Sequence, residues 1–115
     1  MRTLCLQFQP RRAAGLSPQV MTVLMARVAA ALPHMREFSF RRGSARGPYI
    51  NYFFESRTPA RVWKALRGQA LRHRRLGGSL RQSTIVTCQG SRGWENYLLL
   101  HHFDSAQPLD TLAGV

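Results

Sequence analysis

The sequence predicts a single α+β domain, and three observations support this class. First, 115 residues with 44% hydrophobic content suit one domain with a core of its own. Second, short segments in which apolar and polar side chains alternate recur along the chain and predict strands. Third, Ser17-Pro18 and Thr58-Pro59 each place a hydroxyl residue before a proline, which is typical of a helix N-terminus.

The first third of the chain predicts one strand, a loop and one helix. Apolar residues alternate within residues 3–9 and would share one face of the strand, namely Leu4, Leu6 and Phe8. Residues 10–15 are expected to form the loop. The helix begins at Ser17-Pro18 and is stopped by Pro33. Apolar positions three or four residues apart predict its core-facing stripe, which consists of Val20, Leu24, Val28 and Ala31.

A hairpin follows, with strands at residues 35–42 and 49–55 and a glycine-bounded loop at residues 43–47. In the first strand we expect Phe38 and Phe40 to face inward. Both faces of the second strand are apolar, with one face formed by Tyr49 and Phe53 and the other by Ile50, Tyr52 and Phe54. Such a strand lies centrally in a sheet or meets a partner. We therefore expect a homodimer formed through the sheet.

The second helix is predicted to begin at Thr58-Pro59 and the helical region to end at Gly77-Gly78. Its inward residues are expected to be Val62, Trp63, Leu66 and Ala70. Residues 80–89 and 94–103 then predict a second hairpin. The order β-α-β-β-α-β-β is the ferredoxin-like plan, with two helices on one face of an antiparallel sheet and an extra C-terminal strand. We assign residues 1–104 to this domain and residues 105–115 to a C-terminal tail that is expected to be disordered.

Positive charge dominates the composition, with 17 Lys and Arg against five Asp and Glu and a net charge of +12. Too few carboxylates are present to pair with the arginines, so most of the positive field must face solvent or an anionic partner. That partner could be a nucleic acid, an acidic protein or a small anionic ligand. Phosphate contacts require density of charge rather than a strict motif. The candidate nucleic-acid contacts on the second helix are Arg67, Arg72, Arg74 and Arg75.

Residues 46–53, RGPYINYF, resemble the third-strand motif of the RNA-recognition domain. That motif stacks bases on aromatic side chains displayed by the sheet. In this chain Pro48 and Ile50 occupy its two aromatic positions.

Common catalytic and metal-binding motifs are absent from the sequence, including G-x-S-x-G, the Walker-type loop and H-E-x-x-H. Cys5 and Cys88 form no C-x-x-C pair, so they are expected to be reduced core thiols. His101 and His102 are adjacent on a strand and would point to opposite faces, which argues against joint chelation of a metal. No secretory pattern or membrane span is evident, and we expect a cytoplasmic protein. No cofactor follows from these residues.

Residues 52–75, YFFESRTPARVWKALRGQALRHRR, contain a strand ending in an aromatic residue, then Glu-Ser, a helix with Trp-Lys and a His-Arg pair. This segment resembles the antibiotic-biosynthesis and haem-degrading monooxygenases, small ferredoxin-like chains that dimerise into an α+β barrel. The resemblance implies an apolar pocket between sheet and helices. Haem-degrading members use an Asn on the first strand, a helix Trp and a later His; the positions correspond here to Gln7, Trp63 and His73.

Three functions follow as hypotheses. The resemblance implies a monooxygenase-like protein that binds an aromatic or haem-like anionic ligand, with Tyr49, Asn51 and Phe53 as candidate ligand-binding residues. The charge instead favours a non-catalytic module that binds nucleic acid. An interaction module of the inhibitor or immunity type, which binds an acidic protein surface, is also compatible with the small size.

Overall fold

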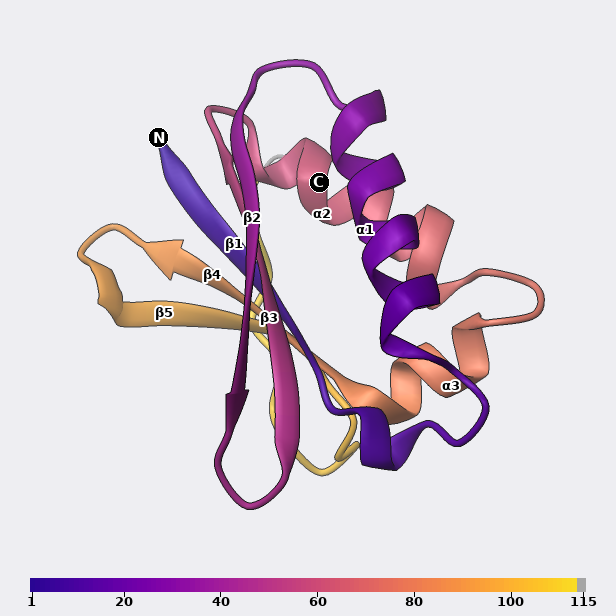
Figure 1. Ribbon diagram of the computed structural model, residues 1–115. Coiled ribbons are helices and arrows are strands. Elements are labelled where there is room, and N and C mark those ends of the chain that lie inside the picture. Colours follow the sequence, from indigo (N-terminus) through magenta and orange to yellow (C-terminus); the bar gives the residue numbers. More distant parts are fainter. Residues whose placement is uncertain (114–115) are drawn as a thin grey trace.

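The computed structural model describes residues 1–113, which build a five-stranded antiparallel sheet with helices on one of its faces (Figure 1). The strands, in chain order, are β1 Arg2–Phe8, β2 Met35–Ser44, β3 Pro48–Ser56, β4 Thr84–Gly90 and β5 Gly93–His102. The α-helices are α1 Pro18–Ala31, α2 Pro59–Leu66 and α3 Gly77–Ser83. None of the helices in residues 1–113 is long and apolar enough to span a membrane.

The strand order β2-β3-β1-β4-β5 places β1 at the centre, antiparallel to both β3 and β4. The connection from β1 to β2 contains α1 and passes over β3. The connection from β3 to β4 contains α2 and α3 and passes over β1, so that two β-α-β units interleave. This is the ferredoxin-like plan predicted from the sequence, and β5 extends the sheet beside β4. The predicted fold class is therefore confirmed.

Helix α1 begins as its sequence predicts. The Oγ atom of Ser17 accepts a hydrogen bond from the backbone amide of Val20 at 3.1 Å, and Pro18 occupies the first helical position. At the start of α2 the cap is different. The Thr58 hydroxyl does not cap the helix and lies 3.3 Å from the Ser56 hydroxyl.

The predicted core stripe of α1 was wrong in part. The buried side chains are Met21, Met25, Val28 and Ala29, whereas Val20 is 48% exposed and Ala31 is also exposed. The sequence of α1 is apolar on more than one side, so helical periodicity alone permits two neighbouring stripes. Packing against the sheet buries the stripe that contains Met21 and Met25 and leaves Val20 and Val23 exposed.

The predicted strand at residues 80–89 begins only at Thr84, because residues 77–83 form α3. Helix α2 passes into a π-helical turn, Arg67–Leu71, and the chain turns again before Gly77. Gly77 starts α3 rather than ending a helix, and a Cβ there would lie 2.7 Å from the carbonyl oxygen of Leu71. Only glycine permits so close a backbone approach. The expectation of two helices is corrected to three α-helices in the described chain.

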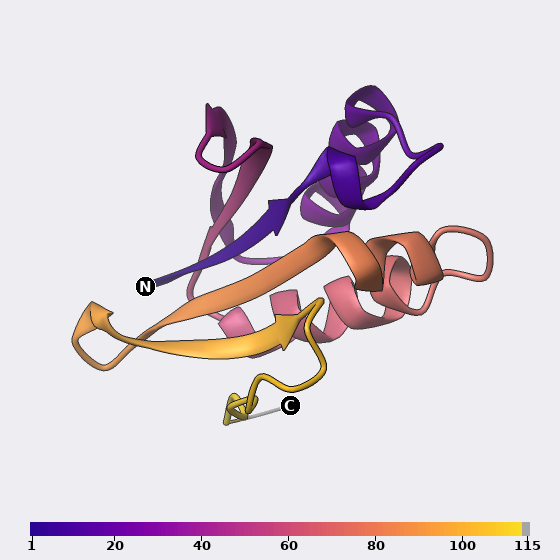
Figure 2. The same ribbon diagram turned by 90° about the horizontal axis from the view of Figure 1, so that it is seen from below.

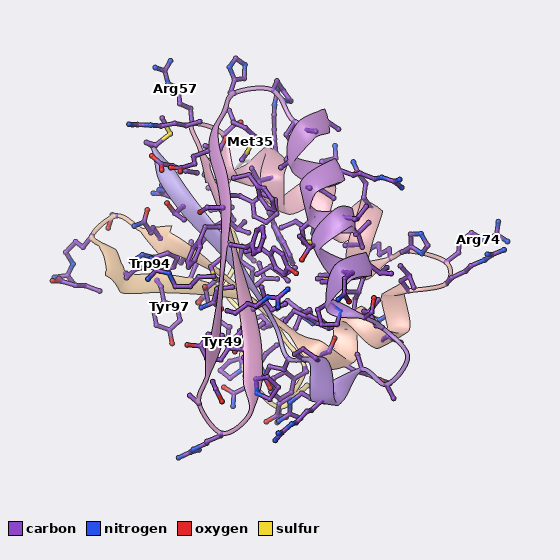
Figure 3. All side chains as sticks on the ribbon, viewed as in Figure 1. Met35, Tyr49, Arg57, Arg74, Trp94 and Tyr97 are labelled. Atoms are coloured by element: carbon purple, nitrogen blue, oxygen red, sulfur yellow. The ribbon has the colours of Figure 1, made fainter. Side chains whose placement is uncertain are left out.

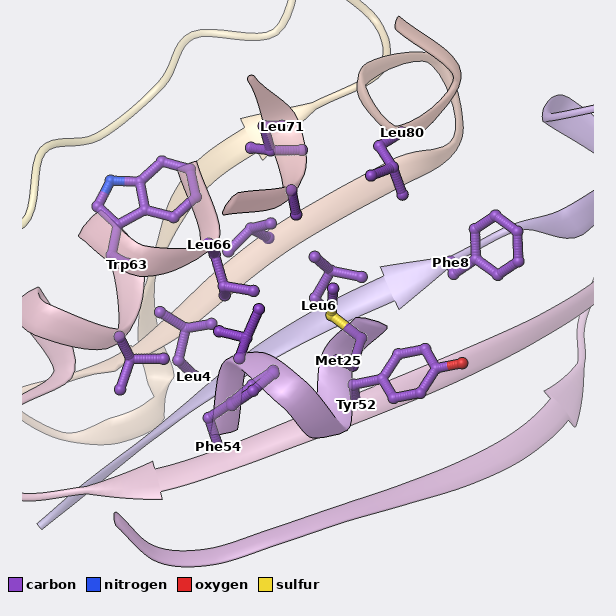
Figure 4. Close-up of a cluster of buried hydrophobic side chains, with 14 of the residues drawn as sticks. Leu4, Leu6, Phe8, Met25, Tyr52, Phe54, Trp63, Leu66, Leu71 and Leu80 are labelled. Carbon is purple, nitrogen blue, oxygen red and sulfur yellow. The ribbon is translucent and has the colours of Figure 1, made fainter. Parts of the chain in front are cut away.

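The core lies between the sheet and the helices (Figure 4). Strand β3 alternates as predicted, with Ile50, Tyr52 and Phe54 buried toward the helices. Strand β1 contributes the fully buried Leu4, Leu6 and Phe8. On β2 the prediction holds less well, since Phe38 is half-buried but Phe40 is 47% exposed. The reason is that β2 is an edge strand, where the helices cover less of the sheet.

The C-terminal tail, expected to be disordered, returns along β5 over its described residues (Figure 2). The amide of Leu99 donates to Oδ2 of Asp110 at 2.8 Å, and the amide of Asp110 donates to the carbonyl of Leu99 at 2.8 Å. Leu112 is buried against the core. Edge strand β5 is thereby partly covered, which satisfies backbone groups that an open edge would leave unpaired.

Candidate functional site on the open sheet face

The sheet face that carries no helix, here called the open face, holds a hollow of about 280 Å³. Strand alternation sends Leu4, Leu6 and Phe8 of β1 toward the helices, so the intervening Cys5 and Gln7 point to the open face. Four strands contribute to the lining of this hollow: Cys5, Gln7, Asn51, Phe53, Ile85, Thr87 and Trp94.

Strand register fixes the centre of the hollow. Cys5 is directly opposite Phe53 on β3 and Thr87 on β4, which makes one row across the face. Gln7 lies between Asn51 and Ile85 in the next row. Neighbours in such a row have Cβ atoms about 5 Å apart, close enough for their side chains to touch one ligand.

Strand β5 supplies a second aromatic ring to the hollow. Trp94 is 43% exposed and lines the hollow together with Phe53 of β3. Trp94 and Tyr97 lie on the side of the sheet away from the helices (Figure 3). The pairing of β4 with β5 is irregular between Cys88 and Gly90. Because of this irregularity, the side chains at the start of β5 do not follow the regular alternation between the two faces of the sheet.

A chain of side-chain hydrogen bonds runs along one end of the open face. Nε of Arg12 donates to Oε1 of Gln9 at 2.7 Å, and Nε2 of Gln9 donates to Oε1 of Gln7 at 2.9 Å. Nε2 of Gln7 then donates to Oδ1 of Asn51 at 3.1 Å. The amides are thereby held in fixed orientations, because each one is tied to the next.

This chain ends in a second hollow of about 180 Å³, here called the arginine hollow. Gln7 lines both hollows, so they adjoin. Three arginines and no acidic residue line the arginine hollow, namely Arg11, Arg12 and Arg46. Arg46 and Gly47 both have positive φ, +56° and +122°, which makes the tight turn that brings Arg46 to this end of the sheet.

The charges near the site are largely unneutralised. Within residues 1–113 one ion pair forms, between Nε of Arg36 and Oε1 of Glu55 at 3.6 Å. Burial raises the pKa of Cys5 to about 12, so its thiol is neutral at physiological pH and is a weak nucleophile. The lining of the open-face hollow is therefore neutral, and the positive charge lies at the adjoining arginine hollow.

The structure brings together four of the residues predicted from the sequence. Gln7, Asn51 and Phe53 line the hollow, and Tyr49 lines the adjoining arginine hollow. The aromatic ring of Tyr49 lies over Gly43 of β2, where a Cβ would come within 2.3 Å of it. These residues share the open face because they alternate on β3 and β1.

Trp63 and His73 lie elsewhere. Trp63 is 7% exposed and packs in the core, on the helix side of the sheet (Figure 4). His73 lies in the turn after Leu71, where its Nδ1 accepts hydrogen bonds from the amides of Arg75 and Leu76, both at 3.1 Å. The structure therefore does not gather Gln7, Trp63 and His73 into one site.

The apolar pocket between sheet and helices that the resemblance implies is occupied by core side chains. Tyr52, Phe54 and Leu66 are fully buried there. The hollows described above lie outside this space.

The arginines predicted to contact nucleic acid are separated from the open face. Arg72, Arg74 and Arg75 border a groove beside α1. Arg67 is half-buried, with its Cζ 5.4 Å from the centre of the Trp63 ring. Sequence reasoning missed Trp94, Arg11 and Arg12 as site residues, since nothing in a loop or an irregular strand end indicates the direction of a side chain.

Fold and site together define a small ferredoxin-like α+β domain whose uncovered sheet face carries aromatic, amide and arginine side chains. Comparison with known proteins finds no matching family model, no similar curated protein and no similar solved structure. Among residues 1–113, no three His, Cys, Asp or Glu side chains come together as a metal site would require.

Proposed function

We propose that the open face binds single-stranded nucleic acid without catalysis. The observation that carries this proposal is the adjacency of the two hollows, which meet at Gln7. One hollow presents the rings of Phe53 and Trp94, and the other presents three arginines. Bases stack on aromatic rings, and phosphates pair with guanidinium groups, so one strand could use both hollows at once.

Arg12 is well suited to a phosphate. Its Nε donates to Gln9, and its guanidinium lies over the ring of Phe103, with Cζ 3.7 Å from the ring centre. Both contacts fix the plane of the guanidinium and leave the two terminal nitrogens to donate together. A phosphate accepts such a pair of hydrogen bonds, and a preorganised arginine loses less side-chain entropy on binding it.

The proposed stacking differs from that of the RNA-recognition domain. The two aromatic positions of that motif are Pro48 and Ile50 in this chain. Ile50 is buried toward the helices, and Pro48, two residues earlier on β3, is on the same side of the strand. Here Tyr49, Asn51 and Phe53 reach the open face instead. The proposal therefore rests on the placement of these side chains and not on the motif.

Fluorescence anisotropy with labelled single-stranded DNA and RNA tests the proposal, with oligonucleotides of about eight to twelve residues. Phe53→Leu and Trp94→Leu remove one ring each while keeping an apolar side chain. Loss of one stacked base should weaken binding roughly 5- to 150-fold. Phe40→Leu is the matched control. Phe40 is an exposed aromatic residue of β2 that lies opposite Tyr52, on the helix side of the sheet. Equal affinity of all three variants would contradict the proposal.

The homodimer predicted from the sequence would use the same face, so it competes with this proposal. Sedimentation velocity with and without an oligonucleotide separates them. A monomer that binds the strand supports nucleic-acid binding. A stable dimer that Phe53→Leu dissociates, and that binds no oligonucleotide, would favour self-assembly instead.

The aromatic or haem-like ligand also stays a prediction. An absorbance spectrum of the purified protein distinguishes it, because a haem or flavin band in the visible region would favour the small ligand. Excess ultraviolet absorbance typical of nucleotides would favour the open-face proposal.

A further inference from the structure

A groove runs between α1 and the turn at residues 72–76, on the helix side of the molecule. Two hollows of about 340 and 810 Å³ form it, and they share Leu24, Arg27 and His73 in their linings. We call it the α1 groove. None of the residues that line the open-face hollows contributes to it.

One part of the α1 groove is aliphatic. Its apolar lining consists of Val20, Val23, Leu24 and Leu76. Val20 and Val23 are 48% and 52% exposed, although they lie on α1, which is longer than α2 and α3. They recur with Leu24 at the three- and four-residue spacing that aligns side chains along one helix face. Such a face packs readily against a second helix.

The other part is basic. Arg27, Arg72, Arg74 and Arg75 border it, and no Asp or Glu is among its lining residues. The turn that carries three of these arginines is fixed by His73, whose Nδ1 accepts two backbone amides. Arg74 extends from this turn away from the body of the molecule (Figure 3). The positive charges are therefore presented from a defined backbone rather than from a loose loop.

We propose that the α1 groove binds an acidic amphipathic helix of a partner protein. The aliphatic side chains of that helix would cover Val20, Val23 and Leu76, and its carboxylates would face the four arginines. Helix-in-groove recognition commonly uses apolar anchors at this spacing. Complementary charge along the border would fix the orientation of the helix and speed its association.

Two other occupants fit the groove less well. No Phe, Tyr or Trp side chain lines it, and the imidazole of His73 is already engaged by two backbone amides, so the bases of a nucleic acid would find no phenyl or indole ring to stack on. A membrane surface is flat on this scale and would contact the border of a concave groove rather than its floor. Binding of a nucleic acid or of a membrane to the α1 groove can be distinguished by experiment from binding of a helix. The occupant of this groove is also independent of nucleic-acid binding at the open face.

Anisotropy of a labelled synthetic peptide tests the inference. The peptide has roughly 18 residues, enough for a helix to form, with Leu at helical spacing and Glu at most other positions. A second peptide has the same composition in scrambled order. Val20→Ser combined with Val23→Ser removes the apolar contact, and Arg27→Gln combined with Arg72→Gln removes charge. The matched controls are Leu109→Ser and Arg92→Gln, since both residues are exposed and outside the groove.

The amphipathic peptide is expected to bind, and each groove variant should weaken it about fivefold or more, as side chains at the centre of an interface do. The two controls should change its affinity less than about twofold. Equal binding of the scrambled peptide, or an equal loss in the controls, would overturn the inference. Absence of peptide binding at low salt would also overturn it. Binding of phosphatidylserine vesicles or of single-stranded DNA that depends on Val20 and Val23, with no peptide binding, would assign the groove to another partner.

Discussion

The guanidinium of Arg12 lies over the aromatic ring of Phe103, with its Cζ atom 3.7 Å from the ring centre. The two residues are at opposite ends of the chain, one after β1 and the other after β5. Their contact holds Arg12 at the arginine hollow, and within residues 1–113 no carboxylate pairs with it. If the open face binds nucleic acid, this contact should matter for affinity.

Substitution of Arg12 by Gln should lower the salt dependence of oligonucleotide binding. Each phosphate contact adds about 0.7 to the slope of log affinity against log salt on single strands, so the slope should fall by about that amount. Arg92→Gln is the control of equal charge loss, at the exposed β4–β5 turn. Identical slopes for Arg12→Gln and Arg92→Gln would show that Arg12 makes no phosphate contact.

Phe103→Leu should act differently from Arg12→Gln. It keeps the charge but removes the stacking that orients it, and an exposed cation–π contact contributes about 0.5–1 kcal/mol. Affinity should fall by roughly two- to fivefold with an unchanged salt slope. A change in slope as large as that of Arg12→Gln would contradict an orienting role for Phe103.

Tyr52 and Thr22 join the sheet to α1 through their hydroxyl groups, 2.7 Å apart. Tyr52 is fully buried, and burial raises its pKa, so the phenol stays protonated. Tyr52→Phe should lower the free energy of unfolding by about 0.5–1.5 kcal/mol. A double-mutant cycle with Thr22→Val, measured by urea unfolding, should show coupling of similar size. Tyr97→Phe, at an exposed tyrosine, should have no measurable effect.

His101 should make stability depend on pH. Burial lowers its pKa, opposed by the hydrogen bond to the carbonyl of Arg81 and reinforced by the charges of His102 and Arg81. The unfolded chain then binds a proton more readily than the folded chain. The free energy of unfolding should therefore fall as pH drops below about 6.5, by at most about 1.4 kcal/mol per pH unit for this group.

His101→Gln keeps a nitrogen donor for the Arg81 carbonyl and removes the titration. Its stability curve between about pH 5 and 7 should be flatter than that of the parent chain. His34→Asn is the control, because His34 is exposed and Asn tolerates its positive φ of 61°. Parallel curves for His101→Gln and the parent would contradict this assignment.

Asp110 should hold the tail on β5. Asp110→Ala removes the acceptor for the Leu99 amide, which should cost about 1 kcal/mol of stability and increase hydrogen exchange at that amide. Asp104→Ala removes only a local contact with the amide of Ala106 and should have a smaller effect. Unchanged exchange at Leu99 in Asp110→Ala would show that the tail does not protect the edge.

Period-two alternation was a dependable guide where a strand lies between two neighbours. In β3 it separated Ile50, Tyr52 and Phe54 from Tyr49 and Phe53 correctly. The candidate ligand-binding residue Asn51 lies between Tyr49 and Phe53 on this face, and Gln7 had been indicated by the family resemblance. The sequence could not indicate Trp94, whose direction depends on the irregular pairing of β5 with β4. Nor could it indicate that Arg12 would meet Phe103, because both follow strands whose ends are brought together only by the complete sheet.

The sequence by itself determined the order of the five strands, the positions of α1 and α2, the alternation of the central strands and the excess of positive charge, since these follow from local periodicity, capping and composition. Tertiary structure decided the rest. Helix α1 had two apolar stripes of similar quality, and only packing against the sheet chose Met21 and Met25 over Val20. The glycine at position 77 could end one helix or begin another, and only the folded chain shows that it begins α3, close to the Leu71 carbonyl. Such choices depend on contacts between distant segments, which local sequence does not encode.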